Sequence, residues 1–176
     1  MDLLPDLILG LTASICAFTD LQKRKIYNLI LFPSLVAAVL WHLLQEPPMI
    51  GTSLLGVFTG AALLFLPFMA GAMGAGDVKL LAVVGAWKGP LFAFQVLLVA
   101  TIAGGLWALV ILWREKRLVS ACKTIINVFI GLFFRKQGLS MLPRLGTSVP
   151  PEDTVPYGVA IAAGVLLLYL VEVSGL

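Results

Sequence analysis

The sequence has little charge, and this scarcity determines its class. Of the 176 residues only 12% are charged, whereas 60% are hydrophobic, and the mean hydropathy is +1.04. A composition this apolar is typical of an integral membrane protein and excludes an ordinary soluble domain. Nearly all of the chain must therefore lie in membrane segments or their connections. We predict a single integral-membrane domain over residues 1–176.

Residues that usually build metal and nucleophile sites are also scarce. The chain has two cysteines, Cys16 and Cys122, and one histidine, His42. Neither cysteine has a second cysteine or a histidine at metal-ligand spacing, so we expect no metal site and no disulfide framework. No Ser-His-Asp or Cys-His set is indicated, and we expect no cofactor.

The N-terminal segment lacks the basic region that precedes the apolar core of a cleavable signal peptide. Asp2 and Asp6 stand in that place. We therefore interpret the first apolar stretch as a retained membrane helix.

The apolar residues form six segments separated by charged or turn-forming stretches. The segments cover residues 3–19, 29–44, 50–72, 78–87, 91–113 and 154–172. We predict an all-α fold: a polytopic membrane protein with about six transmembrane helices. The segment 78–87 is the shortest, because ten helical residues reach only about 15 Å, whereas a perpendicular crossing needs about 20 residues.

The basic residues predict the topology. Eleven of the twelve Lys and Arg residues follow the first, third and fifth segments, and only Lys88 lies elsewhere. By the positive-inside rule, six crossings with an outer N-terminus place those eleven in the cytoplasm. If 78–87 did not cross, the basic stretch 114–144 would lie outside. We therefore expect 78–87 to cross, in a multi-pass protein of the cell membrane.

Residues 114–150 form the one long connection. Apolar residues recur there at helical spacing, with Lys123, Asn127 and Arg135 among them. This pattern predicts an amphipathic helix on the anionic cytoplasmic leaflet. Its role would be that of a surface anchor, with guidance of a substrate as the alternative.

Two aspartates occupy costly positions. Asp20 ends the first apolar segment and Asp77 precedes the fourth, so both lie near the cytoplasmic boundary. An ionisable side chain at such a boundary indicates function by default, and two together indicate a carboxylate pair of the aspartic-protease kind. Each also has a structural alternative. Asp20 could be an interfacial charge neutralised by Lys23 or Arg24, and Asp77 could be the N-cap of a helix that begins at Val78.

The residues around Asp77 are candidates for substrate binding. Gly74 and Gly76 would allow another backbone to come close to the carboxylates, and Lys79 follows two positions after Asp77. A second glycine pair, Gly56 and Gly60, forms a GxxxG pattern that is typical of close helix packing.

Three stretches of the chain carry a family resemblance: DLQKRKIYN at 20–28, GAGDVKL at 74–80 and VPYGVA at 155–160. They resemble the type IV prepilin peptidase family of intramembrane aspartic proteases, including its small Tad/Flp-pilus and preflagellin branches, and the second stretch matches the family's GxGD motif. Tyr27 stands where the family usually has proline. The chain lacks the cysteine-rich insertion of the bifunctional members, so methyltransferase activity is not indicated.

The resemblance implies an endopeptidase that removes a short basic leader from pilin-like precursors. Cleavage would take place at the cytoplasmic face of the cell membrane, which is the inner membrane in a cell that has two. Asp20 and Asp77 would be the catalytic residues, which share a proton and titrate as a coupled pair. The implied partners are the precursor and membrane lipids, without nucleic acid. Two alternatives are a proton-coupled small transporter and a non-catalytic scaffold of a secretion machine.

Overall fold

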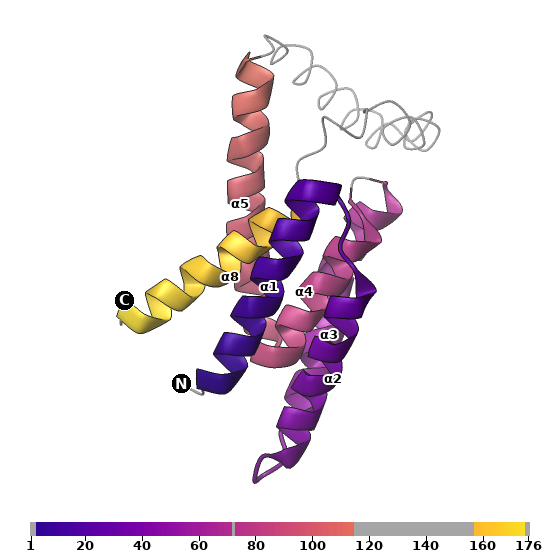
Figure 1. Ribbon diagram of the computed structural model, residues 1–176, viewed down its shortest axis with the longest axis vertical. Coiled ribbons are helices and arrows are strands. Elements are labelled where there is room, and N and C mark those ends of the chain that lie inside the picture. Colours follow the sequence, from indigo (N-terminus) through magenta and orange to yellow (C-terminus); the bar gives the residue numbers. More distant parts are fainter. Residues whose placement is uncertain (1–2, 72, 115–156, 175–176) are drawn as a thin grey trace, which may run out of the picture.

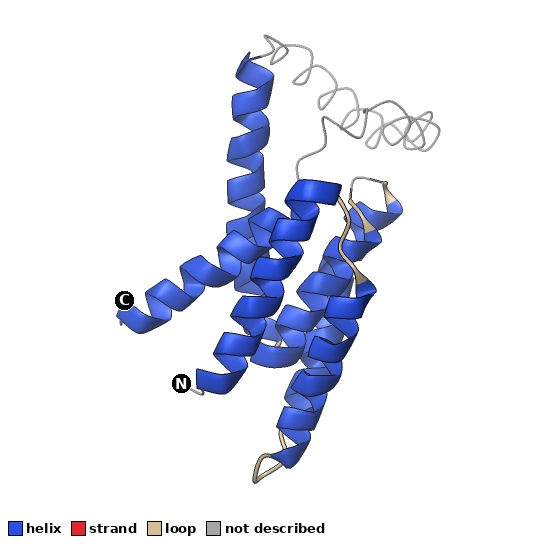
Figure 2. Cartoon of the chain, in the orientation of Figure 1, coloured by secondary structure: helices blue, strands red, loops and turns tan. Residues whose placement is uncertain are grey.

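The computed structural model describes residues 3–71, 73–114 and 157–174. This part of the protein contains six helices and no strand (Figures 1 and 2). The helices are α1 (Leu3–Lys23), α2 (Asn28–Leu44), α3 (Ile50–Met69), α4 (Ala75–Lys88), α5 (Pro90–Arg114) and α8 (Tyr157–Ser174). The prediction of an all-α fold is confirmed. The predicted amphipathic connection 114–150 lies outside the described residues, apart from Arg114 at the end of α5.

Four of the described helices, α1, α3, α5 and α8, are long and apolar enough to cross a membrane. The protein is thus a multi-pass membrane protein. The helix α2 is apolar but has 17 residues, and α4 has 14. The number of about six crossings stays a prediction, because these two helices are shorter than an ordinary span.

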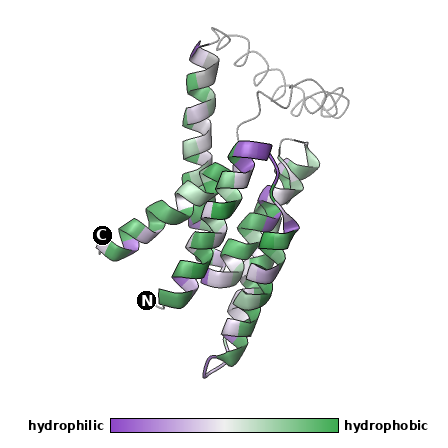
Figure 3. Ribbon diagram, in the orientation of Figure 1, coloured by the Kyte–Doolittle hydropathy of each residue, from purple (hydrophilic) through white to green (hydrophobic). Residues whose placement is uncertain are grey.

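The short helix α4 lies at the centre of the fold. It packs against each of the other five described helices, and nine of its 14 residues are buried. A helix that is surrounded by other helices needs no polar face and no lipid-facing stripe. The large exposed apolar side chains instead lie outside α4, and much of the ribbon of the surrounding helices has the colour of hydrophobic residues (Figure 3).

Glycines bring α3 and α4 into close contact. A Cβ atom at Gly56 would run into the backbone of Gly85, and one at Gly60 would run into the backbone of Leu81. The backbones can approach this closely only because those side chains are missing. The interpretation of the GxxxG pattern as helix packing is confirmed.

Buried polar side chains also join the helices. The Ser34 hydroxyl on α2 accepts hydrogen bonds from the Trp87 indole of α4 at 3.0 Å and from the Thr12 hydroxyl of α1 at 3.1 Å. Ser53 on α3 donates to the Ala86 carbonyl of α4 at 2.9 Å. Polar groups in an apolar interior are stable only when they are paired in this way, so these bonds favour one arrangement of α1, α2, α3 and α4.

Candidate active site

Asp20 continues the buried stripe of α1. The buried residues of this helix recur every three or four positions and end in Cys16 and Asp20, the spacing that places side chains on one helix face. The helix extends four residues beyond the predicted end at 19, so Asp20 lies within the helix and is 7% exposed. It is therefore buried rather than a simple interfacial charge, although the charge of Arg24 still acts on it.

The start of α8 holds Asp20 in place. The backbone N–H of Gly158 donates to Asp20 Oδ2 at 3.0 Å, and the backbone of Val159 also forms a hydrogen bond with Asp20. The first N–H groups of a helix have no partner within that helix, and they carry a partial positive charge. A carboxylate from α1 supplies the partner, so the contact joins two helices through residues that lie 138 positions apart in sequence.

Asp77 lies in the first turn of α4. The prediction that it is the N-cap of a helix starting at Val78 is wrong, because α4 begins at Ala75 and Gly74 is the N-cap. Asp77 is the third helical residue, and its Oδ2 accepts the backbone N–H of Gly74 at 3.2 Å. An acidic residue at this position reaches back to cap the helix from inside. Asp77 is also buried, with 9% of its surface exposed.

Both aspartates line one open cavity of about 350 Å³. The loop between α1 and α2, the first residue of α2 and the start of α4 supply its other walls: Arg24, Lys25, Ile26, Tyr27, Asn28, Gly74 and Gly76. The two carboxylates are close enough for their charges to interact. The structure therefore brings together the two acidic residues that the sequence places 57 positions apart.

The predicted substrate-binding residues differ in their surroundings. Gly74 and Gly76 both line the cavity. A Cβ atom at Gly74 would lie 3.5 Å from Asp77 Oδ2, an ordinary contact, whereas one at Gly76 would lie 2.9 Å from the Cβ of Ile26. Gly76 thus also serves the packing of the loop after α1. A direct role for either glycine in substrate binding stays a prediction.

Lys79 lies at the edge of the site. Its Nζ donates to Asn28 Oδ1 at 2.9 Å in an exposed hydrogen bond that joins α4 to the first residue of α2. Asn28 lines the cavity and Lys79 does not. The structure therefore shows Lys79 orienting a wall residue, and a direct contact with substrate stays a prediction.

Sequence reasoning missed Gly158 and Ile26 as parts of the site. A Cβ atom at Gly158 would lie 2.9 Å from Asp20 Oδ2 and 3.0 Å from Ile26 Cδ1. Ile26 consequently touches both glycines, Gly76 on α4 and Gly158 on α8. The available signal was the stretch 155–160, which carried part of the family resemblance but did not indicate a contact with Asp20.

Among the described residues no group of three or more His, Cys, Asp or Glu side chains is placed to hold a metal ion. The chemistry that the cavity offers is that of two buried carboxylates, with Arg24 and Lys25 in its wall.

Comparison with known proteins identifies the family. The family model of the type IV leader peptidase family matches residues 7–109, which include both aspartates. No curated protein and no solved structure matches the chain. The matched region is more than half of the sequence, and it spans most of α1, all of α2, α3 and α4, and most of α5. The chain therefore belongs to the type IV leader peptidase family.

Proposed function

We propose that the protein is an aspartic endopeptidase that removes the short basic leader from pilin-like precursors at the cytoplasmic face of the cell membrane. Family membership supports the peptidase activity on leader-bearing precursors. The observation that carries the aspartic mechanism is the pair Asp20 and Asp77, two buried carboxylates from two helices that line one cavity.

Two carboxylates that face one cavity can divide the work of peptide hydrolysis, because repulsion between like charges keeps one proton on the pair. The ionised carboxylate removes a proton from a water molecule, and the resulting hydroxide adds to the scissile carbonyl carbon. The protonated carboxylate donates a hydrogen bond to the carbonyl oxygen. When the C–N bond breaks, a proton from the pair passes to the leaving amine, and the pair regains its single shared proton.

The backbone contacts keep the pair in position before substrate arrives. Gly158 and Val159 hold Asp20 from α8, and Gly74 holds Asp77 from its own helix turn. Catalytic groups that are already fixed need little reorganisation during the reaction, which lowers the barrier.

The position of the cavity supports a cytoplasmic site. Lys23, Arg24 and Lys25 end α1 and begin the loop beside Asp20, and hydrophilic residues gather at this end of α1 (Figure 3). Basic clusters of this kind remain in the cytoplasm during membrane insertion. A leader that emerges from the membrane on that side would meet the open cavity directly.

The test is cleavage of a reporter precursor by purified enzyme in lipid vesicles. The reporter carries a short basic leader ending in glycine, followed by an apolar segment of about 20 residues, long enough to span the bilayer. Asp20→Asn and Asp77→Asn keep the side-chain shape but remove general acid–base function, so each should lower kcat at least about hundredfold. Glu46→Gln, which removes an exposed carboxylate from the loop between α2 and α3, should cleave like the wild type.

Both Asn variants should still accumulate as folded protein in the membrane. Cleavage at the wild-type rate by either variant would refute the carboxylate pair, whereas a non-catalytic scaffold would not cleave the reporter even as the wild type.

A further inference from the structure

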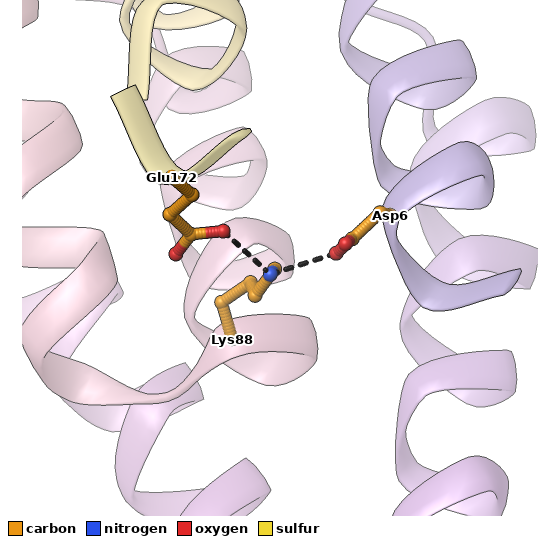
Figure 4. Close-up of polar contacts among 3 residues, drawn as sticks. All are labelled: Asp6, Lys88 and Glu172. Atoms are coloured by element: carbon orange, nitrogen blue, oxygen red, sulfur yellow. Dashed lines mark hydrogen bonds and ion pairs between the residues drawn. The ribbon is translucent and has the colours of Figure 1, made fainter. Parts of the chain in front are cut away.

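An ion-pair cluster joins three helices at the end opposite the cavity. Lys88, the last residue of α4, places its Nζ 2.7 Å from Asp6 Oδ1 on α1 and 3.2 Å from Glu172 Oε2 on α8 (Figure 4). The Lys88 and Asp6 side chains are each 19% exposed. The ammonium also lies 5.5 Å from the ring centre of Phe92 and 5.1 Å from that of Tyr169.

The same three helices build the active site at their other ends. Fourteen residues separate Asp6 from Asp20 on α1, eleven separate Asp77 from Lys88 on α4, and fourteen separate Gly158 from Glu172 on α8. At a rise of about 1.5 Å per residue these intervals correspond to about 21, 17 and 21 Å. Each helix is thus a rod with a site group at one end and a member of the ion cluster at the other.

The two ends differ in how they join α1 to α4. At the cavity end Asp20 is bonded to α8, and Asp77 is bonded within its own helix, so neither bond joins the two catalytic carboxylates to one another. At the far end Lys88 bonds α4 directly to α1 and to α8. The pair between Lys88 and Asp6 is partly shielded from water, which makes it stronger than a fully exposed pair, whereas the contact with Glu172 is exposed. These contacts can therefore limit both the sliding and the rotation of α4.

We infer that Lys88 is a positioning residue: through Asp6 and Glu172 it sets the placement of α4 against α1 and α8, and thereby the alignment of Asp77 with Asp20. This inference rests on the proposed function, because it assumes that the two aspartates are the catalytic pair. It also accounts for the one basic residue expected on the outer side of the membrane, since two carboxylates compensate its charge.

Lys88→Met tests the inference, because it removes the ammonium and keeps an unbranched side chain of similar length. A small displacement of catalytic groups can slow a reaction up to about a hundredfold. We expect kcat per folded enzyme to fall about tenfold, with KM changed less than about twofold because the cavity wall is intact. The separate variant Lys88→Arg should keep the wild-type kcat, since a guanidinium can bond both carboxylates. Glu46→Gln removes a charge in the loop between α2 and α3 and should have no effect.

A merely structural role gives a different result: less folded Lys88→Met enzyme, with unchanged kcat for the fraction that folds. That result would overturn the inference, as would a failure of Lys88→Arg to keep the wild-type kcat. If Lys88→Met does not fold, Asp6→Asn and Glu172→Gln serve instead, because each leaves one ion pair. Each should lower kcat. Adding Lys88→Arg to either variant should not restore kcat, because the missing carboxylate is still absent. Unchanged kcat in both would overturn the inference.

The parallel variants Asp20→Asn and Asp77→Asn separate the two proposals. If they remain active, the proposed catalytic pair is wrong. If they are inactive while Lys88→Met has the wild-type kcat, the pair stands and only the positioning role of Lys88 is wrong.

Discussion

Gly158 offers the sharpest test of how the site is assembled. Its N–H bonds Asp20 Oδ2 at 3.0 Å, and a Cβ atom on it would lie only 2.9 Å from the same oxygen. Gly158→Ala therefore keeps the backbone donor but forces the carboxylate to move away from it. We expect the variant to fold and to cleave precursor slowly.

The expected fall in kcat follows from the hydrogen bond between Gly158 and Asp20 that is lost. A hydrogen bond to a charged group contributes about 1.5–3 kcal/mol. If the transition state loses that contribution, kcat falls about 10- to 150-fold, at about 1.4 kcal/mol per factor of ten.

The variant should lose some stability but still fold. The two atoms nearest to the new Cβ are Asp20 Oδ2 and Ile26 Cδ1, both at the free ends of side chains that can shift. Crowding of this kind lowers the free energy of unfolding by about 1–3 kcal/mol, whereas replacing glycine by alanine in a helix raises it by about 1 kcal/mol. Thermal unfolding of the purified variant should therefore remain cooperative but occur at a lower temperature than in the wild type, because the hydrogen bond to Asp20 is lost as well.

The assay is the rate of reporter cleavage in lipid vesicles, normalised to folded enzyme. Gly105→Ala is the control for a glycine-to-alanine change in a helix, because a Cβ atom there meets nothing within 4 Å. A folded Gly158→Ala enzyme with the wild-type kcat would show that the contact between α8 and Asp20 is not needed for catalysis.

Two further predictions concern the glycines of the cavity and the topology. Gly74→Ala should lower the unfolding temperature less than Gly76→Ala, because its Cβ would be 3.5 Å from the nearest atom, whereas the Cβ of Gly76→Ala would meet Ile26 at 2.9 Å. A large loss of cleavage in Gly74→Ala with little loss of stability would indicate that substrate approaches this backbone. Equal unfolding temperatures for the two variants would contradict the packing argument. A cysteine introduced at Gln22 should react with a membrane-impermeant thiol reagent only from the cytoplasm, and one introduced at Gln45 only from outside. The distribution of basic residues predicts this orientation. Labelling of Gln22→Cys in intact cells would overturn the predicted topology.

Much of the fold could be predicted because membrane insertion depends on local sequence. A run of apolar residues lowers its free energy in the bilayer whatever the rest of the chain does, and its length and flanking charges follow directly from the sequence. The helices α1, α2, α3 and α5 accordingly begin and end within a few residues of the predicted segments. The two aspartates were identifiable for the same reason, since a charge at the membrane boundary is costly without a function.

The boundaries near the site were less predictable, because short polar residues serve both as ends of helices and as parts of them. Asp20 marks the end of the apolar run, yet the backbone stays helical to Lys23. Asp77 was expected before the first turn of its helix and lies inside it, since Gly74 can act as the N-cap without a side chain. Capping depends on a few backbone angles that the hydropathy pattern does not contain.

What the sequence by itself determined is the class, the helices and the identity of the two candidate carboxylates. Only the tertiary structure decided that α4 lies at the centre, that Gly158 holds Asp20 across 138 residues, and that Lys88 meets both Asp6 and Glu172. These contacts depend on how helices rotate and slide against one another. That choice is made by packing and hydrogen bonding between residues that no local period relates.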